Sequence, residues 1–151
     1  MRIVVQRVSR ATVRVEGEVT GSIDEGLLVF LGVGREDDEK DLQWLVGKVI
    51  GLRVFEDEEG RMNRCLSEVG GSILVISQFT LFGNLRKGMR PSFNRAADPE
   101  VAERTYEEFL DRVGEELGRP AEAGRFGASM EIEAVNDGPV TIVIDSKDKR
   151  F

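Results

Sequence analysis

The chain of 151 residues contains no histidine. A hydrolase with this sequence therefore has no Ser–His or Cys–His pair for nucleophilic catalysis, and no imidazole ligand for zinc. Its proton transfers would depend on a carboxylate, a lysine, water or the substrate itself. This absence limits the available chemistry more than any other feature of the composition.

Cysteine is almost absent as well, because Cys65 is the one thiol. It cannot form a disulfide within the chain or build a Cys-rich zinc site, and we expect a mostly buried side chain in a reducing compartment. The acids Asp37, Asp38, Glu39 and Asp41 resemble a metal cluster in composition. Their position at the start of a predicted helix favours capping instead. We expect neither a metal nor a cofactor.

Long apolar runs are also missing, and none approaches the roughly 20 residues of a membrane span. Residues 1–5 lead directly into a strand pattern without a signal-peptide region. The hydrophobic content of 40% and charged content of 32% are typical of a soluble globular protein. We expect one domain over residues 1–151, in the cytoplasm and with no membrane partner.

The net charge of −7 argues against non-specific binding to nucleic acid, and we expect no DNA partner. Residues 84–97 depart from this average, because they contain Arg86, Lys87, Arg90 and Arg95 and no acid. Such a patch can hold a few phosphates of an RNA end. A solvated loop with clustered charge explains the same pattern equally well.

Apolar periodicity predicts six to eight strands and two helices. We expect strands at residues 2–10, 11–15, 18–23, 27–33, 53–56, 73–80, 130–135 and 140–144. The second and third would form a hairpin around Glu16-Gly17, and the last two would be joined through residues 136–139. Because the strands come as hairpins, the sequence predicts an α+β domain with a mainly antiparallel, barrel-like β-sheet and two α-helices packed outside.

The first predicted helix covers residues 36–52, with Asp37 or Asp38 as its N-cap. The second begins at Asp98-Pro99, an acid followed by proline at the first helical position. Its inner face carries apolar residues and Tyr106. Gly118 and Pro120 would end it.

Ser77, Gln78 and Thr80 are candidate functional residues, because they lie at the end of a predicted strand. A hydroxyl there needs a base to act as a nucleophile, and Lys87 is a conceivable but unselected partner. Taken alone, hydrogen bonds to the local backbone are the favoured explanation of these side chains. Phe126 would stack on a base or pack on the domain.

Five short segments occur together along nearly the whole chain. They are Val5-Gln6-Arg7-Val8, Ser77-Gln78-Phe79-Thr80-Leu81, Lys87-Gly88-Met89-Arg90-Pro91-Ser92-Phe93, Phe126-Gly127-Ala128-Ser129-Met130 and Asn136-Asp137-Gly138-Pro139-Val140-Thr141. Their order and spacing resemble those of the D-aminoacyl-tRNA deacylase (D-tyrosyl-tRNA deacylase) family. The resemblance implies hydrolysis of the ester between a D-amino acid, or glycine, and the 3′-terminal adenosine of tRNA, by a homodimer.

The resemblance also implies roles for individual residues. Ser77, Gln78, Phe79 and Thr80 would line the aminoacyl pocket. The backbone amides of Phe79 and Thr80 would stabilise the oxyanion, with the substrate's 2′-OH assisting proton transfer. The terminal adenosine would be held by Phe126, Gly127, Ala128 and Met130.

Chirality would be read by a cis dipeptide, Gly138-Pro139, which enters the partner subunit's pocket and rejects L-amino acids while Arg7 holds it in place. Contacts with tRNA phosphates would come from Arg86, Lys87 and Arg90. Two alternatives remain at this stage. One is a conventional Ser/Thr esterase, and the other is a non-catalytic module that binds aminoacyl-tRNA.

Overall fold

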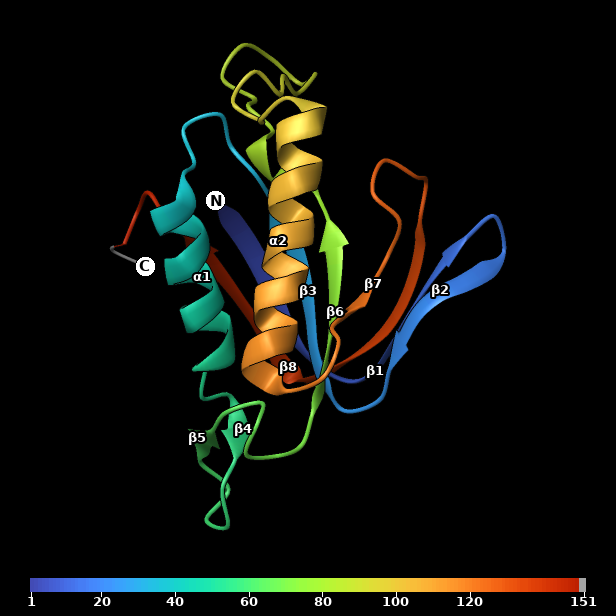
Figure 1. The fold of residues 1–151 in the computed structure, drawn as a ribbon, viewed down its shortest axis with the longest axis vertical. Helices are drawn as coiled ribbons and strands as arrows, with labels where there is room; N and C mark the ends of the chain where they lie inside the picture. The colour runs from blue at the N-terminus through green and yellow to red at the C-terminus, as the bar shows by residue number, and fades with distance from the viewer. Residues whose placement is uncertain (150–151) are drawn as a thin grey trace.

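The computed structural model describes residues 1–149, in which it forms eight strands, two α-helices and one short 3₁₀-helix (Figure 1). In chain order these are β1 (Arg2–Val15), β2 (Glu18–Ile23), β3 (Gly26–Gly32), α1 (Glu39–Ile50), β4 (Phe55–Glu56), β5 (Met62–Arg64), β6 (Ser72–Ser77), η1 (Phe79–Phe82), α2 (Pro99–Leu117), β7 (Glu122–Ala123) and β8 (Glu131–Asp145). Both helices cover the same face of the sheet. No helix of the described part is long and apolar enough to cross a membrane.

The long strand β1 organises the main sheet. Its first half pairs with β3, its second half with β2, and its other edge with β8, all antiparallel. Strand β3 continues the sheet to β6 and β7 through parallel pairing. The sheet curls until Ser22 in β2 donates its backbone N–H to the Glu122 carboxylate in β7, at 3.4 Å. The expected barrel-like α+β fold is confirmed, with a mixed rather than strictly antiparallel sheet.

The core has two parts, one on each face of this sheet. The larger lies under the helices, where β1, β3 and β6 meet the apolar faces of α1 and α2. The smaller fills the inside of the curl, around Val8, Val13, Leu28 and Leu74. Cys65 is half-buried beside Ser67, so it is more open than its residue type suggests.

The helix boundaries follow local capping chemistry. Asp38 caps α1 in a reciprocal capping box with Asp41. The helix therefore begins three residues later than the expected Glu36, while the Asp37 carboxylate accepts the Gly34 backbone N–H at 2.5 Å. Helix α2 begins at Pro99 and ends at Gly118, whose φ of 67° is a left-handed C-cap.

Three strand predictions were wrong. The two strands expected at residues 2–10 and 11–15 form one strand, β1, which runs from Arg2 to Val15. The strand expected over residues 73–80 ends at Ser77, because Leu81 donates its backbone N–H to the Gln78 carbonyl and the chain turns into η1. The two strands expected at residues 130–135 and 140–144 form one strand, β8, because β1 is long enough to pair with both. Residues 137–140 stand opposite Arg7 alone, so they form a bulge rather than a hairpin turn.

Gly26 tests how tightly β3 and β6 pack, and Gly47 in α1 provides an unhindered position for comparison. An alanine Cβ at Gly26 would lie 1.8 Å from the Ser72 carbonyl oxygen, whereas a Cβ at Gly47 in the middle of α1 meets nothing within 4 Å. Gly26→Ala should lower the free energy of unfolding by about 1–3 kcal/mol or more, the cost of overpacking. Gly47→Ala should raise it by up to about 1 kcal/mol through helix propensity. Urea denaturation of both variants measures this, and a neutral Gly26→Ala would contradict the strand pairing.

Candidate active site

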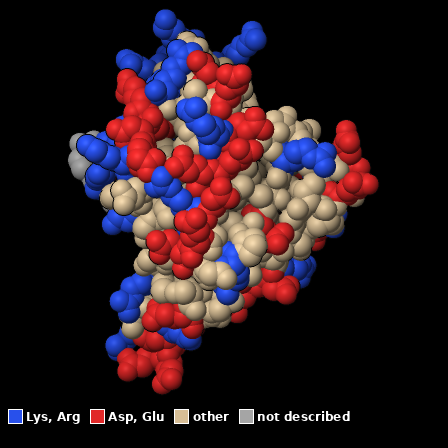
Figure 2. Space-filling view, in the orientation of Figure 1, with Lys and Arg blue, Asp and Glu red and all other residues tan. Residues whose placement is uncertain are grey.

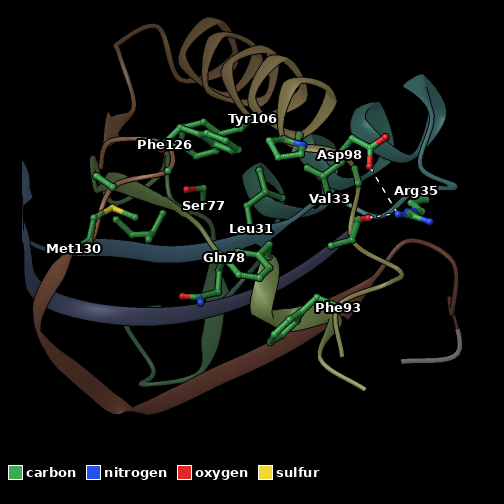
Figure 3. Close-up of a pocket in the computed structure, with 18 of the residues that line it drawn as sticks. Leu31, Val33, Arg35, Ser77, Gln78, Phe93, Asp98, Tyr106, Phe126 and Met130 are labelled. Carbon is green, nitrogen blue, oxygen red and sulfur yellow. Dashed lines mark hydrogen bonds and ion pairs between the residues drawn. The ribbon is translucent and has the colours of Figure 1, made fainter. Parts of the chain in front are cut away.

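A cavity of about 580 Å³ opens beside the C-terminal end of β6 (Figure 3). Strand β3, the first half of α2 and the segment before β8 form its walls. Most of its lining is apolar or aromatic. The lining residues are Leu31, Val33, Arg35, Ile76, Ser77, Gln78, Phe79, Phe93, Ala96, Ala97, Asp98, Pro99, Ala102, Tyr106, Phe126, Gly127, Ala128, Met130 and Ile132.

Two aromatic rings form one wall. Tyr106 on α2 and Phe126 have ring centroids 5.9 Å apart, tilted by 46°. The Tyr106 hydroxyl donates to the Val75 carbonyl oxygen at 2.8 Å, which ties α2 to β6 two residues before Ser77. Burial raises the pKa of Tyr106 to about 12, so its phenol is neutral at physiological pH and acts as a structural anchor.

The polar end of the cavity lies where β6 gives way to η1. Ser77 and Gln78 line it, and the Gln78 side-chain amide donates to the Thr80 hydroxyl. Phe79 and Thr80 begin η1. The first N–H groups of a helix have no partner within it, so η1 provides none for the backbone amides of Phe79 and Thr80.

The mouth of the cavity combines an aromatic pair with an ion pair. Phe79 is 57% exposed and meets Phe93 edge to face, with centroids 5.0 Å apart. Arg35 and Asp98 face each other at 3.8 Å on the rim (Figure 3), and both side chains are exposed. A substrate entering here would pass one cation and one carboxylate.

Most of the predicted substrate-binding residues come together in this cavity, although they lie far apart in sequence. Seven line it: Ser77, Gln78, Phe79, Phe126, Gly127, Ala128 and Met130. Thr80 does not; it is exposed and reaches the cavity through its hydrogen bond with Gln78. Lys87 is also absent from the lining, so no Ser–Lys pair is assembled there.

Sequence reasoning missed Tyr106, Phe93 and the Arg35–Asp98 pair as site residues. Tyr106 could have been found, because a tyrosine on the inner face of a helix needs a partner for its hydroxyl. Asp98 was expected only as an N-cap. It makes no side-chain cap bond and faces Arg35 instead.

A second group of predicted residues lies apart from the cavity. The buried Arg7 side chain donates to the Val54 carbonyl at 2.6 Å and the Asp137 carbonyl at 3.3 Å, and pairs with the Asp137 carboxylate at 3.2 Å. The Asn136 amide donates to the carbonyls of Arg7 and Val140, closing the base of the bulge. Gly138 and Pro139 are exposed at its tip.

The Gly138–Pro139 peptide bond is cis, as the resemblance implies. Neither residue lines the cavity of its own chain, and Arg7 faces a different hollow of about 530 Å³. Arg86, Lys87 and Arg90 are exposed on the loop before Phe93. Within residues 1–149, no three carboxylate or thiol side chains are grouped so as to hold a metal ion.

The fold places a cavity lined mostly by apolar and aromatic side chains at the end of β6, beside the start of η1. Comparison with known proteins identifies the family. The family model described as D-Tyr-tRNA(Tyr) deacylase matches residues 4–145. The chain is 59% identical over 146 residues to the D-aminoacyl-tRNA deacylase of Opitutus terrae, covering 97% of each chain. It is 59% identical over 147 residues to that of Symbiobacterium thermophilum, again covering 97% of each.

Two solved structures share the fold. One, described as c-Myc DNA Unwinding Element Binding Protein, has a TM-score of 0.89 and 42% identity, over 96% of this chain and 98% of that one. The other, a probable eukaryotic D-amino acid tRNA deacylase, has a TM-score of 0.81 at 18% identity, over 95% and 97%. The chain belongs to the D-Tyr-tRNA(Tyr) deacylase family. This membership confirms the resemblance found in the sequence and makes the chain a hydrolase that acts on aminoacyl-tRNA.

Tyr106 is the one tyrosine of the chain, so its ionisation can be followed directly by tyrosinate absorbance. Its pKa is raised in the fold from 10.0 to about 12, so its contribution to stability is complete below pH 10 and is lost as the pH rises through 12. The titration should have its midpoint well above pH 10 and move to about 10 in urea. Tyr106→Phe should lower the free energy of unfolding by about 1 kcal/mol through the lost hydrogen bond. Its stability should also fall less steeply above pH 10 than that of the wild type. A native midpoint near 10 would contradict the buried anchor.

Proposed function

We propose that the cavity beside Ser77 holds the 3′-terminal adenosine of tRNA with a D-amino acid attached, and that the chain hydrolyses the ester between them. One observation carries this proposal. An aromatic cavity ends at two backbone amides freed by the turn from β6 into η1, in a chain of the D-Tyr-tRNA(Tyr) deacylase family.

The aromatic wall suits the adenine ring. A base lying along Phe126 and Met130 would gain stacking and apolar contact, as unpaired RNA bases do in protein sites. The volume of about 580 Å³ is within the usual range for sites that bury small ligands. Tyr106 would support Phe126 from behind and keep this wall rigid.

The polar end suits the scissile ester. With the ester carbonyl oxygen against the amides of Phe79 and Thr80, the negative charge formed on attack meets fixed donors. Water forms the new bond to the carbonyl carbon, the carbon–oxygen bond to the ribose breaks, and the ribose oxygen takes a proton. The products are a free D-amino acid and tRNA, and the same geometry accepts glycine.

The proton transfers would use the 2′-OH of the substrate's own ribose. The chain has no histidine, and Lys87 does not line the cavity beside Ser77. A nucleophilic hydroxyl there lacks the base that it needs. The alternative of a conventional Ser/Thr esterase therefore has no support from the geometry, and family membership does not favour a non-catalytic binding module.

The exclusion of L-amino acids would come from Gly138-Pro139 of a partner subunit. Arg7 and Asn136 hold both sides of this dipeptide, and its tip is exposed. It does not line the cavity of its own chain. A rigid backbone segment entering the partner's cavity would block the space that an L side chain needs, whatever the size of that side chain.

Strand β8 supports a homodimer. Within residues 1–149 it pairs with β1 alone, so its outer edge offers unpaired backbone groups to another chain. Most of the strand is exposed, including Val135 and Val143. The exposed cations Arg86, Lys87 and Arg90 would contact tRNA phosphates. The protein would work in the cytoplasm, where aminoacyl-tRNA is used.

Stereospecific hydrolysis is the direct test of this function. D-tyrosyl-tRNA should lose its amino acid in the presence of the protein, while L-tyrosyl-tRNA stays intact, because the obstacle lies on the L face of the α-carbon. Ester loss from the two matched substrates is the measurement, with the uncatalysed rate as control. Equal rates on both would refute the assignment.

The mechanism can be tested by separating the protein hydroxyls from the substrate hydroxyl. Ser77→Ala and Thr80→Ala should keep substantial activity, since neither supplies a nucleophile. A substrate with a 2′-deoxy terminal adenosine should lose far more. Removal of one oxyanion donor costs about 10²–10³-fold in other enzymes. A loss beyond that range in either variant, or a trapped acyl-enzyme, would restore the nucleophile model.

A further inference from the structure

The loop of residues 84–92, called the basic loop below, projects as an ordered arm from the end of the molecule (Figure 1). Two backbone hydrogen bonds between Asn84 and Ser92, at 2.8 and 3.0 Å, close its base. Inside it, the Asn84 side-chain oxygen accepts the Arg86 N–H at 2.9 Å. Gly88 makes the tight turn at a φ of 123°. Its side chains are therefore presented outward from a defined backbone.

The charge distribution directs a polyanion to this arm. Arg86, Lys87 and Arg90 are exposed, and residues 84–97 contain no acid. Figure 2 shows Lys and Arg gathered at this end of the molecule and a band of Asp and Glu across the helices below it. Helix α2 carries exposed acids such as Glu103 and Glu107. Phosphates are attracted to one end and repelled from the helical face.

The arm also exposes apolar side chains among its cations, which phosphate binding alone does not explain. Met89 is 93% exposed and Leu85 is 58% exposed. A duplex would offer phosphates to the cations but no apolar surface for these two side chains. Unpaired nucleotides offer both, because their bases are unstacked and present apolar faces. Methionine is flexible and polarisable, so it adapts to any base.

The arm leads directly into the cavity. Phe93 follows its base, lines the cavity and packs against Phe79, whose backbone amide is proposed to face the ester. Met89 lies four residues before Phe93, so their Cα atoms are at most about 14 Å apart. An RNA strand that ends in the cavity would therefore meet the arm a few nucleotides before its end.

We propose that the basic loop binds the single-stranded nucleotides that precede the terminal adenosine of the substrate, with its cations on their phosphates and Met89 with Leu85 against an unstacked base. This inference rests on the proposed function. It adds a contact that recognises an unpaired 3′ end, rather than RNA in general.

The test measures the affinity of the full chain for an uncharged acceptor-arm RNA with a single-stranded 3′ end, and for the same duplex with a blunt end, across a range of salt. Met89→Ser is compared with Met62→Ser. Met62 is 59% exposed on β5, at the opposite end of the molecule. Lys87→Gln is compared with Arg61→Gln, which removes an exposed cation paired with Glu59.

Met89→Ser should weaken binding to the single-stranded end roughly 3- to 10-fold at every salt concentration, the scale of partly burying one methionine side chain. Binding to the blunt duplex should respond much less. Lys87→Gln should reduce the slope of log affinity against log salt by about 0.7, the loss of one phosphate contact on a single strand. The Met62 and Arg61 variants should match the wild type.

Met89→Ser that behaves like Met62→Ser, or that weakens both RNAs equally, would overturn the inference. The proposed function is judged separately, by ester loss from D-tyrosyl-tRNA in the wild-type chain. A chain that hydrolyses this substrate but shows no Met89 effect refutes the loop contact and leaves the activity standing. If Met89→Ser weakens binding as expected but the wild-type chain does not hydrolyse D-tyrosyl-tRNA, the proposed activity is refuted and the loop contact stands.

Discussion

The antiparallel pairing of β1 with β8 is the constraint on which the other features of the site depend. Four residues of β8, 137–140, stand opposite one residue of β1, Arg7. Strand β8 must therefore bulge opposite Arg7. The Arg7 guanidinium is buried and bonded to Val54 and Asp137, and Asn136 closes the bulge from the other side. A buried guanidinium is tolerated in this position because it donates to two carbonyl oxygens and pairs with a carboxylate. The exposed Gly138-Pro139 tip is thereby held on the sheet itself.

The cavity depends on a second link between sheet and helix. The Tyr106 hydroxyl joins α2 to the Val75 carbonyl, which also accepts the Gly124 backbone N–H at 3.3 Å. One carbonyl on β6 thus binds both α2, through Tyr106, and Gly124, two residues before Phe126. The aromatic wall and the end of β6 at Ser77 are held at one point, so the two ends of a bound aminoacyl-adenosine would be positioned together.

Much of this arrangement could be predicted from the sequence, where local rules decide the outcome. Helix α2 begins at Pro99 and ends at Gly118 as expected, and periodicity placed Tyr106 on its inner face. The end of β6 was misjudged, because Phe79 and Thr80 have high strand propensity, whereas the chain turns into η1 with a backbone hydrogen bond from Leu81 to Gln78. The bulge in β8 was read as a hairpin, because Asp137-Gly138 is a strong turn signal and strand pairing over long distances is invisible in a local pattern. The Arg35–Asp98 pair could not be found, since two loops far apart in the chain create it.

The central claim is that each active site combines the cavity of one subunit with the Gly138-Pro139 tip of another. Mixed dimers test it most directly. Phe126→Ala should disable the cavity. Gly138→Ala should disable the tip, because φ there is +125° and a Cβ would lie 3.0 Å from the Arg7 guanidinium. Each variant alone should lack normal D-selective hydrolysis. Subunit exchange between them should restore it. One of the two sites in each mixed dimer then has both parts intact, so isolated mixed dimers should recover up to about half the wild-type level. No recovery after exchange that forms verified mixed dimers would contradict the composite site.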